Sequence, residues 1–135
     1  MIVLDASAAI ELLLNTPLGE RVGDRLSEAG ETLHAPHLLD VEVLHVVRRL
    51  RSGGTLGERR ATQVLTDLSE LAVVRYSHQD LVGRAWAMRT TVSAHDAMYV
   101  ALAEALDAPV LTCDGRLARA HGHRAEVELV ELEGH

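Results

Sequence analysis

The chain has 135 residues, of which 47% are hydrophobic and 24% charged, and its formal net charge is −7. This length and composition are typical of one globular domain and argue against a chain that is disordered throughout. The negative charge counts against a simple nucleic-acid-binding module, which is usually basic, but less against a nuclease whose acids bind metal. We expect residues 1–135 to form a single domain.

Features of composition bear on where the protein works and on its chemistry. The single cysteine, Cys113, cannot form an internal disulfide, which fits a reducing compartment. No secretory signal is recognisable before Asp5, and no apolar stretch approaches the length of a membrane span. We therefore expect a soluble, cytoplasmic protein with no membrane partner. All 13 basic residues are arginine, which excludes chemistry built on lysine, such as a P-loop or a Schiff base.

Short apolar runs alternate with helical patterns along the chain. In chain order, we predict a strand at 2–4, helices at 6–14 and from 17 to about 29, a strand at 32–35, helices at 38–51 and 56–68, a strand at 72–76, helices at 79–90 and 95–106, a strand at 109–112, a helix from 115 to about 121, and a strand at 127–130. Strands separated by helices indicate an α/β fold, with a parallel sheet of about five strands covered by helices on both faces. Functional sites in such sheets form beyond the carboxyl ends of the strands.

Two aspartates follow directly after predicted strands. Asp5 comes after the first strand and Asp114 after the strand at 109–112. Each aspartate has the alternative role of capping the helix that follows, which Asp does well. Because the carboxyl ends of parallel strands share one edge of the sheet, both carboxylates are expected there, with the hydroxyls of Ser7 and Thr112 nearby.

Two further acids lie on predicted helices. Glu42 has apolar neighbours three and four positions away, and a carboxylate beside an apolar stripe needs a partner or a metal. The alternatives for Glu42 are a position at the edge of the stripe or a salt bridge to Arg49. Asp96 begins a helix, and its spacing from Ser93 is also that of a capping box.

The joint pattern of these acids points to a metal site. Four carboxylates at one edge of a sheet repel one another strongly unless a positive charge lies between them. Mg²⁺ and Mn²⁺ favour oxygen ligands and activate water for phosphodiester cleavage. The sequence therefore predicts a metal-dependent phosphodiesterase.

The same segments resemble the PIN domains, and most closely the VapC toxins of bacterial toxin–antitoxin pairs. The resemblance covers residues 1 to about 130 and rests on four segments in order: Val3-Leu4-Asp5-Ala6-Ser7-Ala8, Pro36 to Glu42-Val43, His95-Asp96-Ala97 to Ala103, and Leu111-Thr112-Cys113-Asp114. It implies an endoribonuclease that uses Mg²⁺ or Mn²⁺, cuts tRNA, rRNA or mRNA, forms a homodimer and is inhibited by a small VapB-like antitoxin. The implied metal ligands and catalytic residues are Asp5, Glu42, Asp96 and Asp114, with Ser7 and Thr112 as supporting hydroxyls.

The chain departs from the family pattern at two positions. Many relatives have a tyrosine before the third acid, where this chain has His95, and some have a further acid two residues after the fourth, where it has Arg116. We expect His95 and Arg116 to contact RNA, although a histidine at a helix start also often faces water. The number of metal ions, one or two, stays open.

Other functions remain as alternatives. The same nuclease chemistry also serves RNA processing without an antitoxin, and a PIN-like fold without catalysis serves as a binding module. A phosphotransferase or receiver domain also has an acidic pocket on such a sheet, but the absence of lysine counts against a receiver. We expect Trp86, Met88 and Tyr99 to lie in the core or at a dimer contact.

Overall fold

The computed structural model describes residues 1–28 and 30–132, and its centre is a parallel sheet. The strands lie in the order β3-β2-β1-β4-β5, and every neighbouring pair is parallel. They are β1 (Ile2–Leu4), β2 (Leu33–Pro36), β3 (Val73–Tyr76), β4 (Val110–Thr112) and β5 (Val127–Leu129). The five-stranded parallel sheet predicted from the sequence is thereby confirmed.

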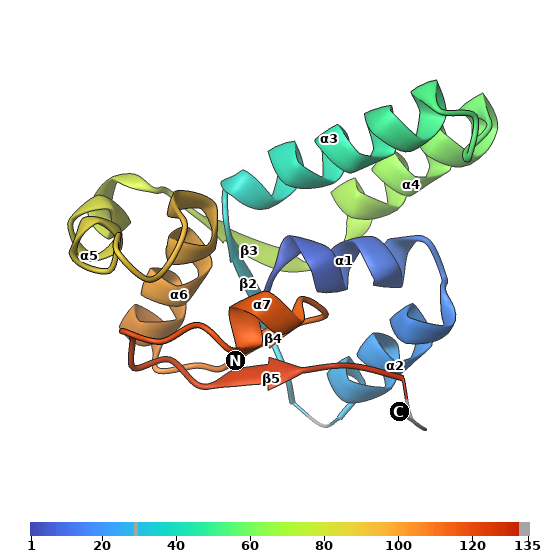
Figure 1. The fold of residues 1–135 in the computed structure, drawn as a ribbon. Coiled ribbons are helices and arrows are strands. Elements are labelled where there is room, and N and C mark those ends of the chain that lie inside the picture. The colour runs from blue at the N-terminus through green and yellow to red at the C-terminus, as the bar shows by residue number, and fades with distance from the viewer. Residues whose placement is uncertain (29, 133–135) are drawn as a thin grey trace.

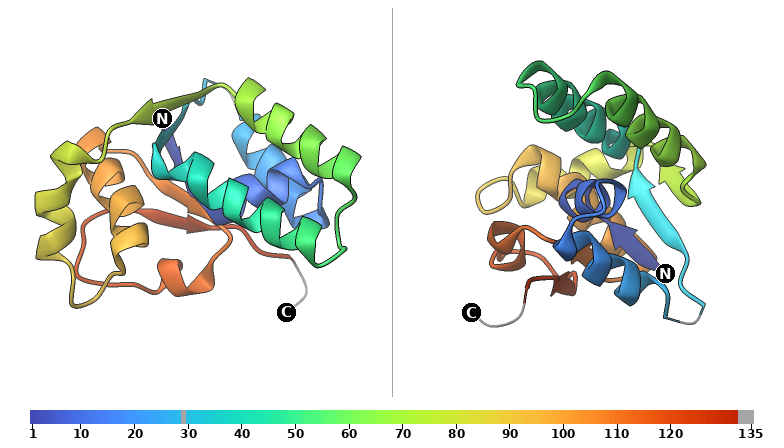
Figure 2. Two further views of the ribbon diagram at one scale, coloured as in Figure 1. Left: turned by 90° about the horizontal axis from the view of Figure 1, so that it is seen from above. Right: turned by 90° about the vertical axis from the view of Figure 1, so that its right-hand side faces the viewer.

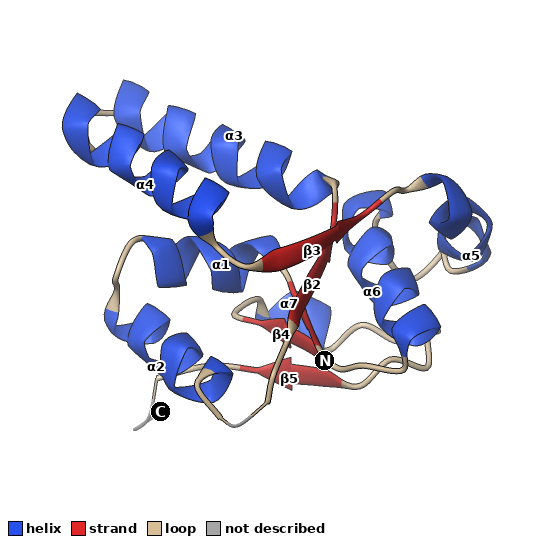
Figure 3. Ribbon diagram, turned by 180° about the vertical axis from the view of Figure 1, so that it is seen from behind, coloured by secondary structure: helices blue, strands red, loops and turns tan. Residues whose placement is uncertain are grey.

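Helices cover both faces of this sheet, as Figure 1 shows. They are α1 (Ala6–Leu13), α2 (Pro17–Leu26), α3 (Leu38–Ser52), α4 (Glu58–Glu70), α5 (Val82–Ala87), α6 (Ala94–Leu106) and α7 (Gly115–Ala118), with a 3₁₀ turn at Gln79–Leu81. Helices α3 and α4 pack side by side as a pair, which is visible in Figures 2 and 3. No helix among residues 1–28 and 30–132 has the length and apolar character required to cross a membrane.

The alternation of side chains along β1 explains why the sheet needs cover on both faces. Ile2 and Leu4 pack into one apolar cluster with residues of α1 to α4, whereas Val3 between them packs into a second cluster with α5 to α7. All three side chains are completely buried. A strand buried on both faces reads as a continuous apolar run, which is the signal that the sequence carries here.

Three predicted helices end earlier than expected. α2 stops at Leu26, where the Ser27 hydroxyl donates to the Asp24 carbonyl, and residue 29 of the predicted helix lies outside the described residues. α7 stops at Ala118, because the chain turns before Gly122, which has a φ of 84°. The predicted helix at 79–90 is instead a 3₁₀ turn followed by the short α5, which contains Gly83 and lacks a side-chain cap.

Candidate active site

The four acids predicted from the sequence line one cavity of about 720 Å³. They come from four separate elements: Asp5 follows β1, Glu42 lies on α3, Asp96 lies in the first turn of α6, and Asp114 follows β4. The cavity therefore opens beyond the carboxyl ends of the neighbouring strands β1 and β4, where α/β sheets commonly place a site. The fold thus gathers side chains that are up to 109 residues apart in the sequence.

Asp5 is the most buried of these acids, with 5% of its surface exposed. Its Oδ1 accepts hydrogen bonds from the Ser7 hydroxyl at 2.6 Å and from the Ala8 backbone N–H at 3.1 Å. Its Oδ2 accepts a hydrogen bond from the Thr112 hydroxyl at 2.6 Å. Burial raises the pKa of Asp5, and the charge of Asp96 adds to this, while the hydrogen bonds from Ser7, Thr112 and Ala8 oppose it.

The hydroxyls of Ser7 and Thr112 also link the carboxyl ends of the neighbouring strands β1 and β4. Ser7 Oγ lies 3.1 Å from Thr112 Oγ1 and accepts a hydrogen bond from the Cys113 backbone N–H at 2.9 Å. Thr112 Oγ1 accepts a hydrogen bond from the Asp114 backbone N–H at 2.9 Å. Each hydroxyl therefore holds Asp5 and at the same time fixes the backbone that leads to Asp114.

The neighbouring Cys113 has no nucleophilic role in this arrangement. Burial raises the pKa of its thiol to about 12, and the charges of Asp5 and Glu11 act in the same direction. The thiol is therefore protonated at neutral pH, whereas nucleophilic catalysis requires the thiolate.

Glu42 is held by Tyr99, a residue expected in the core or at a dimer contact. The Tyr99 hydroxyl, on α6, donates a 2.6 Å hydrogen bond to Glu42 Oε1. Tyr99 is 2% exposed, and burial together with this hydrogen bond raises its pKa, so the phenol remains a donor. No salt bridge joins Glu42 to Arg49 in the described parts of the chain. The sequence did contain a signal for Tyr99 at the site, because Tyr99 lies three residues after Asp96 and so shares its helix face.

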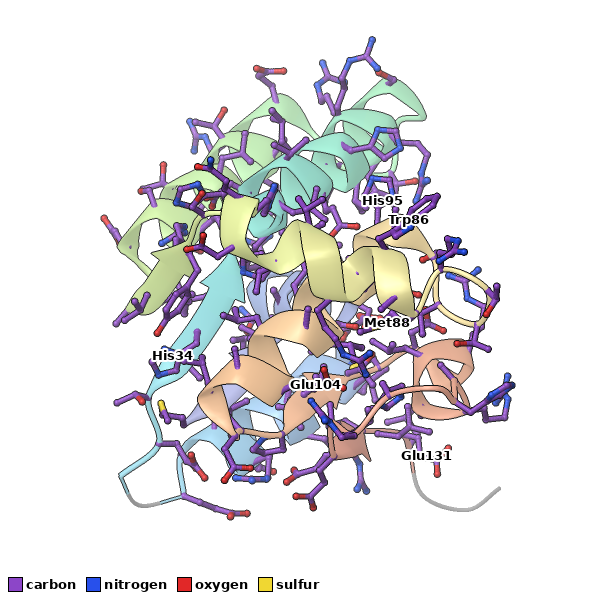
Figure 4. The ribbon with its side chains drawn as sticks, turned by 90° about the vertical axis from the view of Figure 1, so that its left-hand side faces the viewer. His34, Trp86, Met88, His95, Glu104 and Glu131 are labelled. Carbon is purple, nitrogen blue, oxygen red and sulfur yellow. The ribbon has the colours of Figure 1, made fainter. Side chains whose placement is uncertain are left out.

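Met88 and Trp86 were also expected in the core or at a dimer contact. Met88 lies in the core, with 2% exposed, whereas Trp86 is 66% exposed and lies outside the core, so for Trp86 the dimer contact stays a prediction. Figure 4 shows Trp86 on α5, near the outside of the molecule. The Arg89 guanidinium stacks on the Trp86 ring at 4.2 Å from its centroid.

Asp96, His95 and Arg116 form the outer part of the cavity. The Asp96 backbone N–H donates to the Ser93 hydroxyl at 3.3 Å, so the predicted cap of α6 is present while the Asp96 carboxylate lines the cavity. His95 is exposed and also lines the cavity. The Arg116 guanidinium lies 3.5 Å from Asp114 and 4.0 Å from Asp96. It gives these two acids a positive neighbour, although its side chain is 78% exposed.

The donor atoms of this cavity fit a hard divalent cation. The acids that line it offer carboxylate oxygens, and neither cysteine nor lysine competes at the cavity wall formed by the described residues. Within residues 1–28 and 30–132, no three His, Cys, Asp or Glu side chains are placed closely enough to hold a metal ion as a group. Mg²⁺ keeps several of its waters and needs few carboxylates from the protein.

The chain matches the PIN domain over residues 2–122. It is 47% identical to Ribonuclease VapC12 of Mycobacterium tuberculosis over 130 residues, which cover 96% of this chain and 99% of that protein. Its fold is similar to that of VapBC2 from Rickettsia felis, with a TM-score of 0.72 at 13% identity and coverage of 97% and 100%. It is also similar to a toxin–antitoxin complex from Klebsiella pneumoniae, with a TM-score of 0.64 at 16% identity and coverage of 88% and 91%. The chain therefore belongs to the PIN-domain family, and within it to the VapC ribonucleases.

Proposed function

We propose that this protein is a Mg²⁺- or Mn²⁺-dependent endoribonuclease and the toxin of a toxin–antitoxin pair. The observation that carries the proposal is the convergence of Asp5, Glu42, Asp96 and Asp114 on one cavity from four separate elements. The 47% identity to a VapC ribonuclease over nearly the whole chain supports RNA as the substrate. Structural likeness to a toxin–antitoxin complex supports a small antitoxin as the partner.

In this proposal the four carboxylates would bind the cation, and hydrogen-bond donors around them orient two of these carboxylates, Asp5 and Glu42. Ser7, Thr112 and the Ala8 N–H orient Asp5, which is too buried to be solvated as an anion on its own. Tyr99 fixes one oxygen of Glu42 and leaves the other free of that hydrogen bond. A divalent ion held by these carboxylates would supply an activated water and would offset the charge of the phosphodiester.

His95 and Arg116 are the proposed contacts to RNA. Both line the cavity and both are exposed, so a phosphate that enters the cavity passes them. Arginine pairs well with phosphate through its planar fork of N–H donors. Arg116 already lies beside two of the acids, and a bound cation would take over its role as their positive neighbour.

Exposed apolar side chains support the proposal that the chain binds other proteins. Val41 and Leu44 on α3 and Val82 and Trp86 on α5 are 51% to 66% exposed. Large apolar side chains that are exposed to solvent can mark a contact with another protein. We propose the expected homodimer and the antitoxin as these partners, and sedimentation of the chain alone and with its antitoxin would test both.

The direct test of the nuclease is cleavage of total cellular RNA by the wild type and by Asp96→Asn. We expect discrete fragments with Mg²⁺ or Mn²⁺, none with EDTA, and at least a hundredfold slower cleavage by Asp96→Asn. Asn retains the backbone hydrogen bond to Ser93, so the variant should fold normally. Full activity in folded Asp96→Asn would remove this residue from the site. If the folded wild type neither bound Mn²⁺ nor cut RNA, a non-catalytic binding module would be favoured.

The antitoxin part of the proposal has its own test. Cell growth should stop when the chain is produced alone and recover when the gene product encoded beside it is produced as well. Cleavage in vitro without any effect on growth would favour an RNA-processing nuclease that acts without an antitoxin.

A further inference from the structure

A second cavity of about 330 Å³ adjoins the acidic one. The two cavities share Ser93, Asp96 and Arg116, so a ligand can extend from one into the other. Beyond these shared residues the second cavity is lined by Arg119 and His121, and Asp96 is the carboxylate on its wall. The two neighbouring cavities thus differ in charge, one acidic and one rich in basic groups.

Arg119 stands beside the acidic site without a partner of its own. Its guanidinium lies over Gly115, where an added Cβ would come within 2.9 Å of Nη1, and Gly115 directly follows Asp114. Among the described residues, no hydrogen bond or ion pair engages the Arg119 side chain. Arg75 and Arg84, in contrast, each form a bidentate pair with a carboxylate. Arg119 is therefore available for an anion that comes from outside the chain.

The wall that carries these basic groups is held in place by a close backbone approach. Gly122 has a φ of 84°, and a Cβ at this position would overlap Thr91 Oγ1. The loop after α7 therefore packs against the segment that leads into α6, and this places His121 and Thr91 on the same cavity. A side chain at residue 122 would separate the two segments.

We propose that this second cavity binds a backbone phosphate of the RNA, next to the phosphate that lies among the four acids; this inference rests on the proposed nuclease function. RNA is a polyanion, whereas the chain carries a net charge of −7 and its cleavage site is lined by carboxylates. Positive side chains close to the acids therefore favour the binding of RNA beyond the charge that a bound cation would offset. Arg119 supplies the fork of donors that fits a phosphate, and Arg116 lies between the two cavities.

The test measures RNA binding as a function of salt in an Asp5→Asn background, which should prevent cleavage in Mg²⁺. The probe is a fluorescently labelled single-stranded RNA of about 20 nucleotides and mixed sequence. Adding Arg119→Gln should weaken binding about tenfold and flatten the plot of log affinity against log salt by about 0.7, the value for one lost phosphate contact on a single strand. Circular dichroism checks that the variants are folded.

Arg124→Gln is the matched control, because it removes the same charge from an exposed arginine that precedes the amino end of β5 and lines neither of the two cavities. It should leave both the affinity and the slope unchanged. An unchanged slope for Arg119→Gln, an equal effect of Arg124→Gln, or no binding of the probe would overturn the proposed phosphate site. Metal-dependent cleavage of total RNA by the wild type is measured separately. This cleavage would show that the chain is a nuclease even if the binding experiment rules out the phosphate site.

Discussion

Replacement of Thr112 by valine tests how the fold holds its most buried acid. Valine has nearly the shape of threonine, but it cannot donate to Asp5 Oδ2 or accept from the Asp114 N–H, contacts of 2.6 Å and 2.9 Å in the wild type. Thr112 is completely buried, so water cannot easily replace its hydroxyl. A lost hydrogen bond to a buried carboxylate costs about 1.5–3 kcal/mol, and the weakened Asp114 contact adds to this. We expect a total loss of about 2–4 kcal/mol.

The assay is urea unfolding in EDTA, followed by circular dichroism. Thr66→Val is the control, because Thr66 is exposed on α4 and its hydroxyl bonds only to the Thr62 carbonyl of the same helix. The control should stay within about 0.5 kcal/mol of the wild type. If Thr112→Val were as stable as Thr66→Val, the hydroxyl would not be holding Asp5, and our account of the site would be wrong.

The same substitution should also change the pH dependence of cleavage. The hydrogen bond from Thr112 lowers the pKa of Asp5 and so opposes the effect of burial, which means that its loss raises this pKa further. A protonated Asp5 cannot bind a cation as a carboxylate does. The acid limb of the pH profile of Thr112→Val should therefore lie at higher pH than that of the wild type.

Two further predictions concern stability. The hydrogen bond from Arg84 lowers the pKa of Glu104 to about 2 from 4.5, so Glu104→Gln should cost about 2–3 kcal/mol at pH 7 in urea unfolding. This difference in stability should shrink as the pH falls from about 5 towards 2, because Glu104 (Figure 4) then becomes protonated in both the folded and the unfolded state. A stability difference independent of pH would contradict this prediction. Gly19→Ala should lower the free energy of unfolding by about 3 kcal/mol or more through overpacking, because the added Cβ would overlap the Glu11 carbonyl. Gly23→Ala should be neutral or stabilising, because the nearest atom to its added Cβ lies 3.6 Å away. Equal melting temperatures for the two alanine variants would refute this reasoning.

The sequence revealed the acids that follow strands because two independent signals coincided there. Asp5 ends a buried apolar run and starts a helix, and the same is true of Asp114. The capping role and the position on the cavity had been set against each other as alternatives, yet both occur. Each carboxylate accepts a backbone N–H with Oδ1, from Ala8 and from Arg116 respectively, and still lines the cavity. A helix cap is therefore no argument against a functional role for an aspartate after a parallel strand.

The contact between Tyr99 and Glu42 could not be predicted in the same way. The two residues are 57 positions apart, and their meeting depends on how α3 and α6 approach each other across the site. Local patterns give the face of each helix but not the angle at which two helices meet. The exposure of Trp86 has a similar cause, since α5 is a single short helix with no buried residue. The ends of α2 and α7 could not be predicted from the apolar periodicity either, because they depend on a side-chain hydrogen bond of Ser27 and on the backbone conformation of Gly122.

The claim that the four carboxylates hold a divalent cation is tested most directly by calorimetric titration with Mn²⁺. We would titrate the wild type, Asp114→Asn and, as the control, Asp107→Asn. Asp107 is exposed at the end of α6 with a φ of 52°, a conformation that asparagine tolerates well, and it lies outside the acidic cavity. Our account predicts saturable binding by the wild type and Asp107→Asn, and an affinity at least about tenfold lower for Asp114→Asn. Equal affinity of the wild type and Asp114→Asn would contradict it.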